Sequence, residues 1–293
     1  MTGASAAEPT LSVEEFRALR DVVATAAGLD LPVEQLPSVQ RRLRERLPLL
    51  GVETFGEYVR LLRSDPSARG ELESALELLT TNETYFMREA YQLRAFRDEA
   101  LPMLADLASA RRRISVWSAG CSTGEEVYSL AILLLEAQQS ARSPITGYEV
   151  RIFGSDLSKR CLAQARRAIY GPSAFRATTP EFRKRWFVER PEGSLVSERV
   201  RQLCQFGQLN LLDSSRAATV GRVDAIFCRN VLIYFGTHAR RRVIDIFHQR
   251  LYPGGILFLG HSESLLNVST AFELLHFRED LAYRRPRGRE AAS

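Results

Sequence analysis

The sequence predicts an α/β protein with a doubly wound sheet, preceded by an all-helical domain. Three observations lead to this class. Residues Ser12 to Leu79 follow helical periodicity, short apolar strands alternate with helices after Thr81, and two further apolar runs close the chain. The length of 293 residues suffices for two domains of this kind.

The composition is that of an ordinary globular protein, with 45% hydrophobic and 26% charged residues. No apolar run is long enough to cross a membrane, and the first residues lack the regions of a signal peptide, so we expect a cytoplasmic protein with no membrane insertion. The four cysteines and four histidines show no metal-ligand spacing, and we expect buried thiols and no metal. The net charge of +5 allows a weakly acidic partner, although solvated faces are the simpler explanation.

The helical domain is expected at 12–80, after a disordered segment at 1–11. Its first helix has an apolar face, and Ser12 and Glu15 have the spacing of a capping box. A second helix, near Leu36 to Leu47, carries four arginines around an apolar stripe. This pattern is typical of a solvated face, and the alternative is a docking face for an acidic helix, formed by Arg41, Arg42, Arg44 and Arg46.

The second domain is expected at 81–284, followed by a basic tail at 285–293. A basic, aromatic segment at about 171–206 interrupts the alternation of strands and helices, and it is long enough to form a small subdomain. Two terminal runs, Phe272 to Phe277 and Leu281 to Tyr283, predict a hairpin that an ordinary dinucleotide-binding fold does not require. The main strands are predicted at Ile114 to Trp117, Val150 to Gly154, Val223 to Cys228 and Ile256 to Gly260.

The stretch from Ile114 to Leu134 predicts a nucleotide-type cofactor site, because a short strand leads through a turn of small residues into an apolar helix. The glycines of the turn, Gly120 and Gly124, do not meet the G-x-G-x-x-G fingerprint for a pyrophosphate. Glu125 and Glu126 open the helix, where they would repel phosphates. A cationic, phosphate-free cofactor such as S-adenosylmethionine suits this polarity better. For either glutamate alone, the alternative is a helix cap.

Polar residues also follow two of the other predicted strands. Asp156 ends the second strand, where nucleotide-binding folds hold ribose hydroxyls, although alone it would equally cap the next helix. Arg229 and Asn230 follow the buried strand at Val223 to Cys228 and would face the ligand crevice. Tyr234 comes next, with an aromatic body and a hydroxyl, and a core tyrosine has the same signature.

A polar and aromatic cluster, TTNETYFMRE, stands at 80–89, at the junction of the two predicted domains. Together with WSAGCSTGEEVYSLA, IFGSDLS, NLLD, IFCRNVLIYF and PGGILFLGHSESL, in this order and spacing, it resembles the chemotaxis receptor glutamate methyltransferases, the CheR family. The resemblance spans nearly the whole chain. It implies a Rossmann-like class I methyltransferase sheet with a C-terminal hairpin, a helical N-terminal domain and an inserted β-subdomain.

The resemblance further implies S-adenosylmethionine as the cofactor and glutamate side chains of chemoreceptors as methyl acceptors. Arg88 and Tyr234 would lie near the methyl group. The helix with four arginines would dock on the methylation helices of the receptor, and in some family members the subdomain grips a peptide at the receptor's C terminus. The loop around 191–197 departs from the family pattern, which leaves peptide binding open. The implied cofactor residues are Asn82, Thr84, Arg88, Glu126, Asp156, Asn210, Leu211, Arg229 and Asn230.

A glutamate acceptor needs no general base, because a carboxyl with a reference pKa of about 4.3 is ionised near neutral pH. We expect catalysis by positioning, with Arg88 orienting the acceptor and Tyr234 beside the methyl group. His261, the one histidine inside a motif, is expected in a turn that supports the site. The rivals are a methyltransferase acting on another acidic protein, a small molecule or a nucleic acid, and a non-catalytic scaffold that binds the cofactor. A base-modifying enzyme would carry an Asn/Asp-Pro-Pro-aromatic motif where this chain has Arg229-Asn230-Val231-Leu232, so no nucleic-acid partner is expected.

Overall fold

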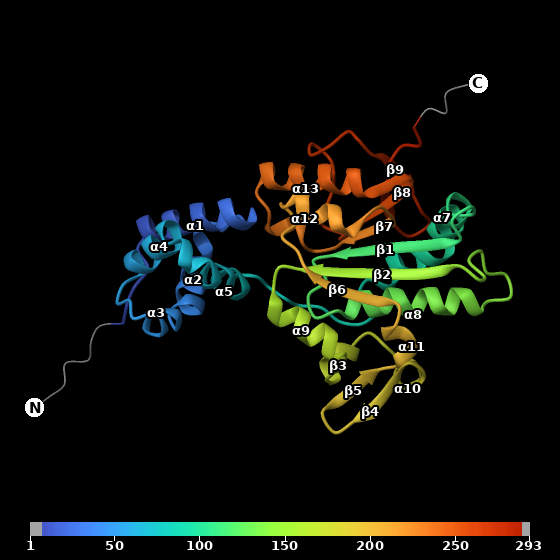
Figure 1. Ribbon diagram of the computed structural model, residues 1–293, viewed down its shortest axis with the longest axis horizontal. Helices are drawn as coiled ribbons and strands as arrows, with labels where there is room; N and C mark the ends of the chain where they lie inside the picture. The colour runs from blue at the N-terminus through green and yellow to red at the C-terminus, as the bar shows by residue number, and fades with distance from the viewer. Residues whose placement is uncertain (1–7, 289–293) are drawn as a thin grey trace, which may run out of the picture. The chain divides into compact units, whose positions relative to one another are not determined.

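The computed structural model describes residues 8–288, which form two compact units (Figure 1). One unit contains the residues up to Thr81 together with Tyr234–Ala239, and the other contains Asn82–Ile233 and the residues from Arg240 onward. Residues 1–7 of the segment expected to be disordered, and residues 289–293 of the expected basic tail, lie outside the described residues. None of the described helices has the length and apolar character needed to span a membrane.

The smaller unit consists of helices, as the sequence predicts. The expected capping box of the first helix is confirmed, since Ser12 accepts from the N–H of Glu15 and Glu15 from the N–H of Ser12. The helix expected near Leu36 to Leu47 is two helices, because Pro48 has no N–H to donate to the carbonyl of Arg44. The helices are α1 (Val13–Ala27), α2 (Leu36–Leu43), α3 (Arg46–Leu49), α4 (Phe55–Ser64) and α5 (Arg69–Leu79).

Two features of this unit differ from expectation. Leu11 is buried and its N–H donates to Gln40 at 2.8 Å, so the prediction of disorder is wrong at the end of the 1–11 segment. The short segment Tyr234–Ala239 also joins the unit, although it is distant in sequence. It is bound through the N–H of Asp30, which donates to the carbonyl of Tyr234 at 2.8 Å, and through an antiparallel bridge between Leu29 and Phe235.

The larger unit contains a seven-stranded sheet with the order β6-β2-β1-β7-β8-β10-β9. The first five of these strands are parallel, and β10 runs antiparallel to β8 and β9, so the predicted closing hairpin is confirmed. Every residue of β7 is buried, as expected for a central strand covered on both faces. The strands are β1 (Arg113–Ala119), β2 (Glu149–Asp156), β6 (Cys204–Gln208), β7 (Val223–Cys228), β8 (Leu251–Leu259), β9 (Glu273–His276) and β10 (Leu281–Arg284).

Helices connect and flank these strands. A helical stretch comes before β1, and the N–H of Met87, just ahead of it, donates to Ser129 on α8 at 3.0 Å. Near the end of the chain, the backbone of Arg285 pairs with Gly254 and Gly255, so the first residue of the expected basic tail continues the fold. The helices are α6 (Ala90–Ala95), a π-helical segment (Phe96–Ala100), α7 (Leu101–Leu107), α8 (Glu125–Gln139), α9 (Lys159–Arg167), α12 (Ser214–Ala217) and α13 (Thr237–Arg250).

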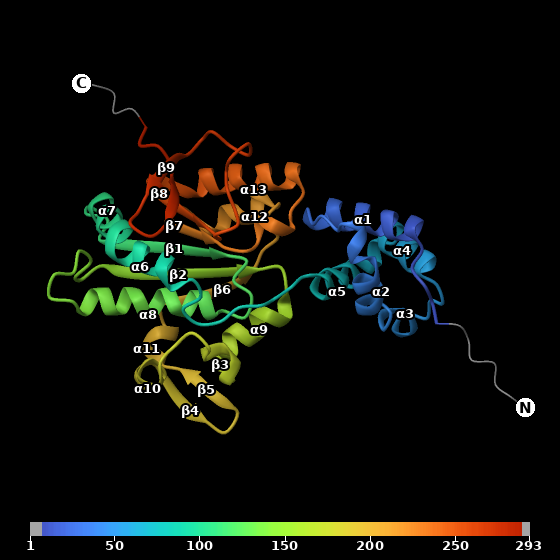
Figure 2. The ribbon, with the colours of Figure 1, turned by 180° about the vertical axis from the view of Figure 1, so that it is seen from behind.

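A second, three-stranded sheet lies within the larger unit, with the order β3-β5-β4, beside α10 (Pro180–Trp186) and α11 (Glu198–Arg201) (Figure 2). Its strands are β3 (Ile169–Tyr170), β4 (Phe187–Arg190) and β5 (Gly193–Val196). The expected insertion at about 171–206 therefore ends too late, because β6, which begins at Cys204, pairs with β2 at the edge of the main sheet. The sequence of β6, CQFGQ, is largely polar, so it does not have the apolar pattern that predicts a strand.

Candidate active site

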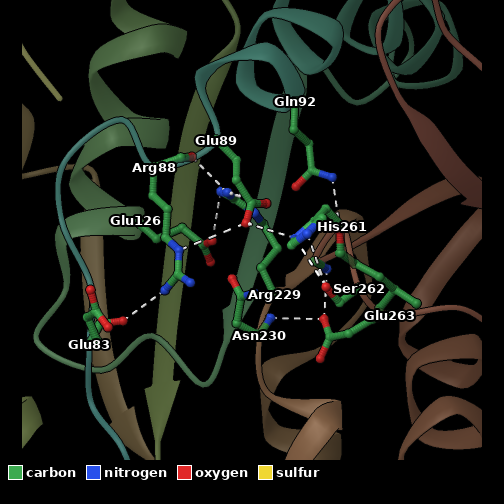
Figure 3. A network of polar contacts seen from close by, with 12 residues as sticks. Glu83, Arg88, Glu89, Gln92, Glu126, Arg229, Asn230, His261, Ser262 and Glu263 are labelled. Carbon is green, nitrogen blue, oxygen red and sulfur yellow. Dashed lines mark hydrogen bonds and ion pairs between the residues drawn. The ribbon is translucent and has the colours of Figure 1, made fainter.

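A buried arginine joins three segments at the carboxyl edge of the sheet (Figure 3). Arg229 follows β7, and its side chain is 2% exposed. Nη1 lies 3.2 Å from a carboxylate oxygen of Glu126, and Nη2 lies 2.9 Å from one of Glu89. Nη2 also donates to the carbonyl of Arg88 at 2.7 Å. Arg229 thus fixes the start of α8 and the segment before α6 against the end of β7.

The two glutamates that open α8 lie in its first turn, after the N-cap residue Gly124. The carboxylate of Glu125 interacts with its own backbone N–H, so the helix-cap alternative stands for Glu125, whereas Glu126 contacts Ser118 and Arg229. Glu125 is buried and accepts from the hydroxyl of Thr123 at 2.6 Å. Glu126 accepts from the hydroxyl of Ser118 at 2.7 Å. Burial raises the pKa of Glu126, and the charge of Arg229 opposes that rise.

The turn between β1 and α8 is shaped by its glycines. Gly120 has φ +81°, and a Cβ there would lie 2.5 Å from a methyl carbon of Val231. The N–H groups of Gly120 and Cys121 donate to the carbonyl of Ser155 at 2.8 and 2.9 Å, which ties the turn to the end of β2. The small residues of this turn therefore let the loop after β7 approach its backbone.

Asp156 connects the same turn to the end of β2. One of its oxygens accepts from the N–H of Ser122 at 2.8 Å and the other from the N–H of Ser158 at 2.9 Å. The N-cap of α9 is Ser158, whose hydroxyl accepts from the N–H of Cys161, so Asp156 supports the start of this helix through the N–H of Ser158 but is not its N-cap residue. Asp156 ends β2, the position at which nucleotide-binding folds hold ribose hydroxyls.

The segment at 82–89 passes over this turn. The carbonyl of Asn82 accepts from the hydroxyl of Ser122 at 3.2 Å. Arg88 is 28% exposed, donates to the carbonyl of Glu83 at 2.9 Å, and has its Nε 3.9 Å from Glu89. Glu89 adopts a left-handed backbone conformation, with φ +53°, as do Met87, Ser122 and Asn230. Left-handed non-glycine residues cost free energy, and they cluster where function requires a particular geometry.

The remaining predicted site residues divide between the two units. Asn210 and Leu211 follow β6, and the N–H of the preceding Leu209 donates to the carbonyl of Asp156 at 3.0 Å. Thr84 lies on the segment between Asn82 and Arg88. Tyr234 belongs to the helical unit, where it lines a cavity of about 220 Å³. The larger unit therefore brings together the proposed cofactor residues, and Tyr234 as a catalytic residue stays a prediction.

Sequence reasoning missed two carboxylates. Glu89 is 14% exposed at its side chain and lies between Arg88, Arg229 and His261, with His261 Nδ1 3.9 Å from one oxygen (Figure 3). Glu263, in the turn after β8, accepts four backbone N–H groups. Both glutamates lie within the sequence motifs that resemble the family, but neither motif indicates which side chains or backbone groups the carboxylate would contact.

The charges of this edge fit a cationic cofactor. Three carboxylates, of Glu89, Glu126 and Asp156, accompany two guanidiniums. In addition, the side-chain oxygen of Asn230 is buried, and no hydrogen-bond partner for it exists among residues 8–288. An acceptor of this kind suits an ammonium or hydroxyl donor. A doubly wound sheet with a closing hairpin and an acidic glycine turn defines the class of S-adenosylmethionine-dependent methyltransferases.

Family comparison identifies the chain within this class. Residues 82–280 match the CheR methyltransferase SAM-binding domain, and residues 14–80 match the CheR methyltransferase all-alpha domain. The chain therefore belongs to the CheR methyltransferase family, as its sequence strings predict. The boundary between the matched regions falls where the helical pattern gives way to the α/β pattern.

Relatives from three bacteria match this chain in sequence over most of their length. The chain is 33% identical over 282 residues to chemotaxis protein methyltransferase 2 of Vibrio cholerae, covering 95% of each chain. It is 38% identical to the chemotaxis protein methyltransferase of Klebsiella aerogenes, covering 90% of this chain and 88% of the relative. Against the chemotaxis protein methyltransferase of Escherichia coli the identity is 37%, with coverages of 90% and 89%.

Proposed function

We propose that this chain transfers the methyl group of S-adenosylmethionine to the side-chain carboxylate of glutamates in chemoreceptors. Membership of the family and the names of the relatives support the reaction class and the receptor substrate. The observation that carries the proposal in the structure is the pair of arginines at the carboxyl edge. Arg229 is 2% exposed and engaged by two carboxylates, whereas Arg88 is 28% exposed. Arg88 is thus the guanidinium that an incoming carboxylate can reach.

The site residues have separate roles in this proposal. Asp156 holds the ribose, and Glu126 lies near the positive charge of the bound cofactor. Asn230 accepts from the methionine end. Arg88 presents a planar fork of N–H donors that matches the two oxygens of the acceptor. Asn82, Thr84, Asn210 and Leu211 complete the cofactor site, and Tyr234 is assigned to the methyl group.

The reaction needs orientation more than acid–base chemistry. Bound S-adenosylmethionine would supply a methyl group activated by a sulfonium, and a carboxylate oxygen of the acceptor would bond to that carbon while the carbon–sulfur bonding pair goes to sulfur. The acceptor is already ionised near neutral pH, so no proton moves. The contribution of the chain is to hold the oxygen in line with the carbon and sulfur and to exclude water.

The receptor-docking face proposed on the helical unit contains fewer exposed arginines than the four that the sequence suggests. Arg42 donates to the carbonyls of Leu78 and Leu79, both at 3.2 Å. Arg44 pairs with Glu8, and Arg46 pairs with the buried Glu71. Three of the four arginines thus stabilise their own unit, and Arg41 is the exposed one. We assign receptor docking chiefly to Arg41, with Arg44 beside it at the partly exposed edge.

A second receptor surface is proposed on the small sheet. An open groove of about 510 Å³ lies there, lined by Phe175, Phe187, Arg183 and Lys184, and by Glu189, which pairs with Arg183 at 2.8 Å. Aromatic and cationic groups together suit a peptide that carries an aromatic and an acidic side chain. We propose the cytoplasm as the compartment, because the four free cysteines suit a reducing environment.

The experiment compares Arg88→Ala with Arg94→Ala. Arg94 is an exposed arginine of α6 that pairs with Glu279, so it serves as a matched control. We expect Arg88→Ala to lower kcat/KM for receptor methylation by about a hundredfold or more, with cofactor Kd changed by only a few-fold. Arg94→Ala should retain both values. Full turnover by Arg88→Ala would remove Arg88 from the mechanism, and failure of the wild-type chain to methylate any acidic receptor would leave it as a scaffold.

A further inference from the structure

The carboxylate of Glu263 accepts hydrogen bonds from four backbone N–H groups. One oxygen accepts from Asn230 at 2.9 Å and from Gly260 at 2.7 Å. The other accepts from Val231 at 2.9 Å and from Ile233 at 3.1 Å. Hydrogen bonds to an ionised acceptor are stronger than neutral ones, and a concave row of N–H groups is a typical anion-binding arrangement. Here the anion is a side chain of the same protein.

These bonds join the loops that follow two neighbouring strands. Asn230–Ile233 comes after β7, and Gly260 comes directly after β8. Figure 3 shows the bond between Asn230 and Glu263. A Cβ at position 260 would lie 2.8 Å from the N of Asn230 and 2.8 Å from a carboxylate oxygen of Glu263. Gly260 is therefore the residue type that allows Glu263 to approach the loop after β7 so closely.

The bonded loop holds Asn230 in an uncommon conformation. Its φ is +58°, in the left-handed region, which non-glycine residues adopt only at a cost. Its side-chain oxygen is buried and has no hydrogen-bond partner within residues 8–288. On the other side of this loop, Val231 packs against Gly120 of the cofactor turn. Val231 is thus confined by the turn, and loss of the bonds to Glu263 would chiefly displace Asn230.

We propose that Glu263 is a positioning residue of the cofactor site, which holds Asn230 where its side chain receives the methionine end of S-adenosylmethionine. This proposal depends on the proposed function in one respect, which is that the carboxyl edge of the sheet is the cofactor site. Glu263 itself bonds to backbone groups and acts through Asn230. Its four acceptor positions are already filled, so it is not assigned a direct contact with the cofactor.

The test is a double-mutant cycle read by cofactor binding, with no receptor present. Glu263→Gln keeps the size of the side chain but turns an NH₂ group toward two of the four N–H donors. We expect it to raise the Kd for S-adenosylmethionine about tenfold or more. In the Asn230→Ala background the same change should raise Kd less than about twofold, because Glu263 acts through a group already removed. Glu279→Gln, at an exposed carboxylate paired with Arg94, is the control and should leave Kd unchanged.

Amide hydrogen exchange provides a readout that does not depend on the cofactor. Exchange at Asn230, Val231 and Gly260 should accelerate in Glu263→Gln and not in the control. Equal effects of Glu263→Gln in both backgrounds, or an unchanged Kd, would overturn the proposal. If Glu263→Gln does not fold, the cycle is run with Glu263→Asp, which keeps the charge and withdraws it by one methylene, and the same outcomes apply. A wild-type chain that does not bind S-adenosylmethionine would instead refute the proposed function.

Discussion

Glu89 and Arg229 form an ion pair of 2.9 Å in which the guanidinium is 2% exposed and the carboxylate 14% exposed. Glu126, on α8, is the third member of this buried group, and one of its carboxylate oxygens lies 3.2 Å from the same guanidinium. We call the three residues the triad. Arg229 stands 103 residues after Glu126 and 140 residues after Glu89 in the sequence. The position of the triad at the carboxyl edge makes the stability of the larger unit and the charge of the cofactor site depend on the same groups.

Removal of Arg229 should destabilise the larger unit strongly. Arg229→Met leaves two carboxylates without their cation, and breaking a buried pair typically costs about 3–5 kcal/mol. The measurement is urea unfolding, with the folded fraction followed by far-UV circular dichroism. Arg151→Gln is the control, because Arg151 forms an exposed pair with Glu149 and should cost no more than about 1 kcal/mol. Equal losses in the two variants would show that the triad does not stabilise the fold.

Cofactor affinity should depend on the ionisation of Glu126. Burial raises its pKa above the ordinary value of 4.5. Without cofactor, the stabilising contribution of this group is present below pH 4.5 and is lost as the pH rises through the raised folded-state pKa. A cation binds best to the ionised carboxylate, so the Kd for S-adenosylmethionine should increase as the pH falls through that raised pKa. Calorimetric titration at several pH values measures this, and Glu126→Gln should bind weakly with a flat profile. A wild-type profile that is also flat would contradict the role of Glu126.

The cofactor turn should not tolerate a side chain at position 120. Gly120→Ala places a methyl group 2.5 Å from Val231 and forces alanine to φ +81°, so it should cost about 1–3 kcal/mol and weaken cofactor binding. Val231→Ala in the same chain should restore part of the loss by removing the contact. Gly70→Ala is the control, since Gly70 lies in α5 with open space around it, and it should stabilise by about 0.5–1 kcal/mol. Thermal unfolding of the four proteins is the measurement.

Charge reversal on the helical unit tests receptor docking. Arg41→Glu should raise the KM for receptor several-fold, without changing the melting temperature or the cofactor Kd, because Arg41 is exposed. The control is Arg17→Glu, at an exposed arginine of α1. Arg42 and Arg46 are unsuitable probes, since their bonds to α5 would make a loss of stability look like a loss of docking. An unchanged KM in Arg41→Glu would show that this face of the helix is a solvated surface and not a docking site.

Much of the fold follows from local sequence signals. The predicted strand at Val223–Cys228 is continuous and apolar, and it coincides with β7. The edge strand β6 escaped prediction because an edge position permits polar residues. The grouping of Tyr234 with the helical unit rests on backbone bonds to Asp30 and Leu29, which carry no sequence signal. Glu263 escaped for the same reason, since its partners are backbone groups brought together by the parallel sheet.

The methyl group should be received by a carboxylate oxygen of a receptor glutamate. The direct measurement incubates the purified chain with radiolabelled S-adenosylmethionine and a chemoreceptor, and then treats the isolated receptor with base. A carboxyl methyl ester hydrolyses to methanol under base, whereas a methylated nitrogen does not. The label should enter the receptor and be released as volatile methanol, and a receptor with its acceptor glutamates replaced by alanine should take up none. Label that stays on the receptor after base treatment, or uptake by the alanine-substituted receptor, would rule out glutamate methylation.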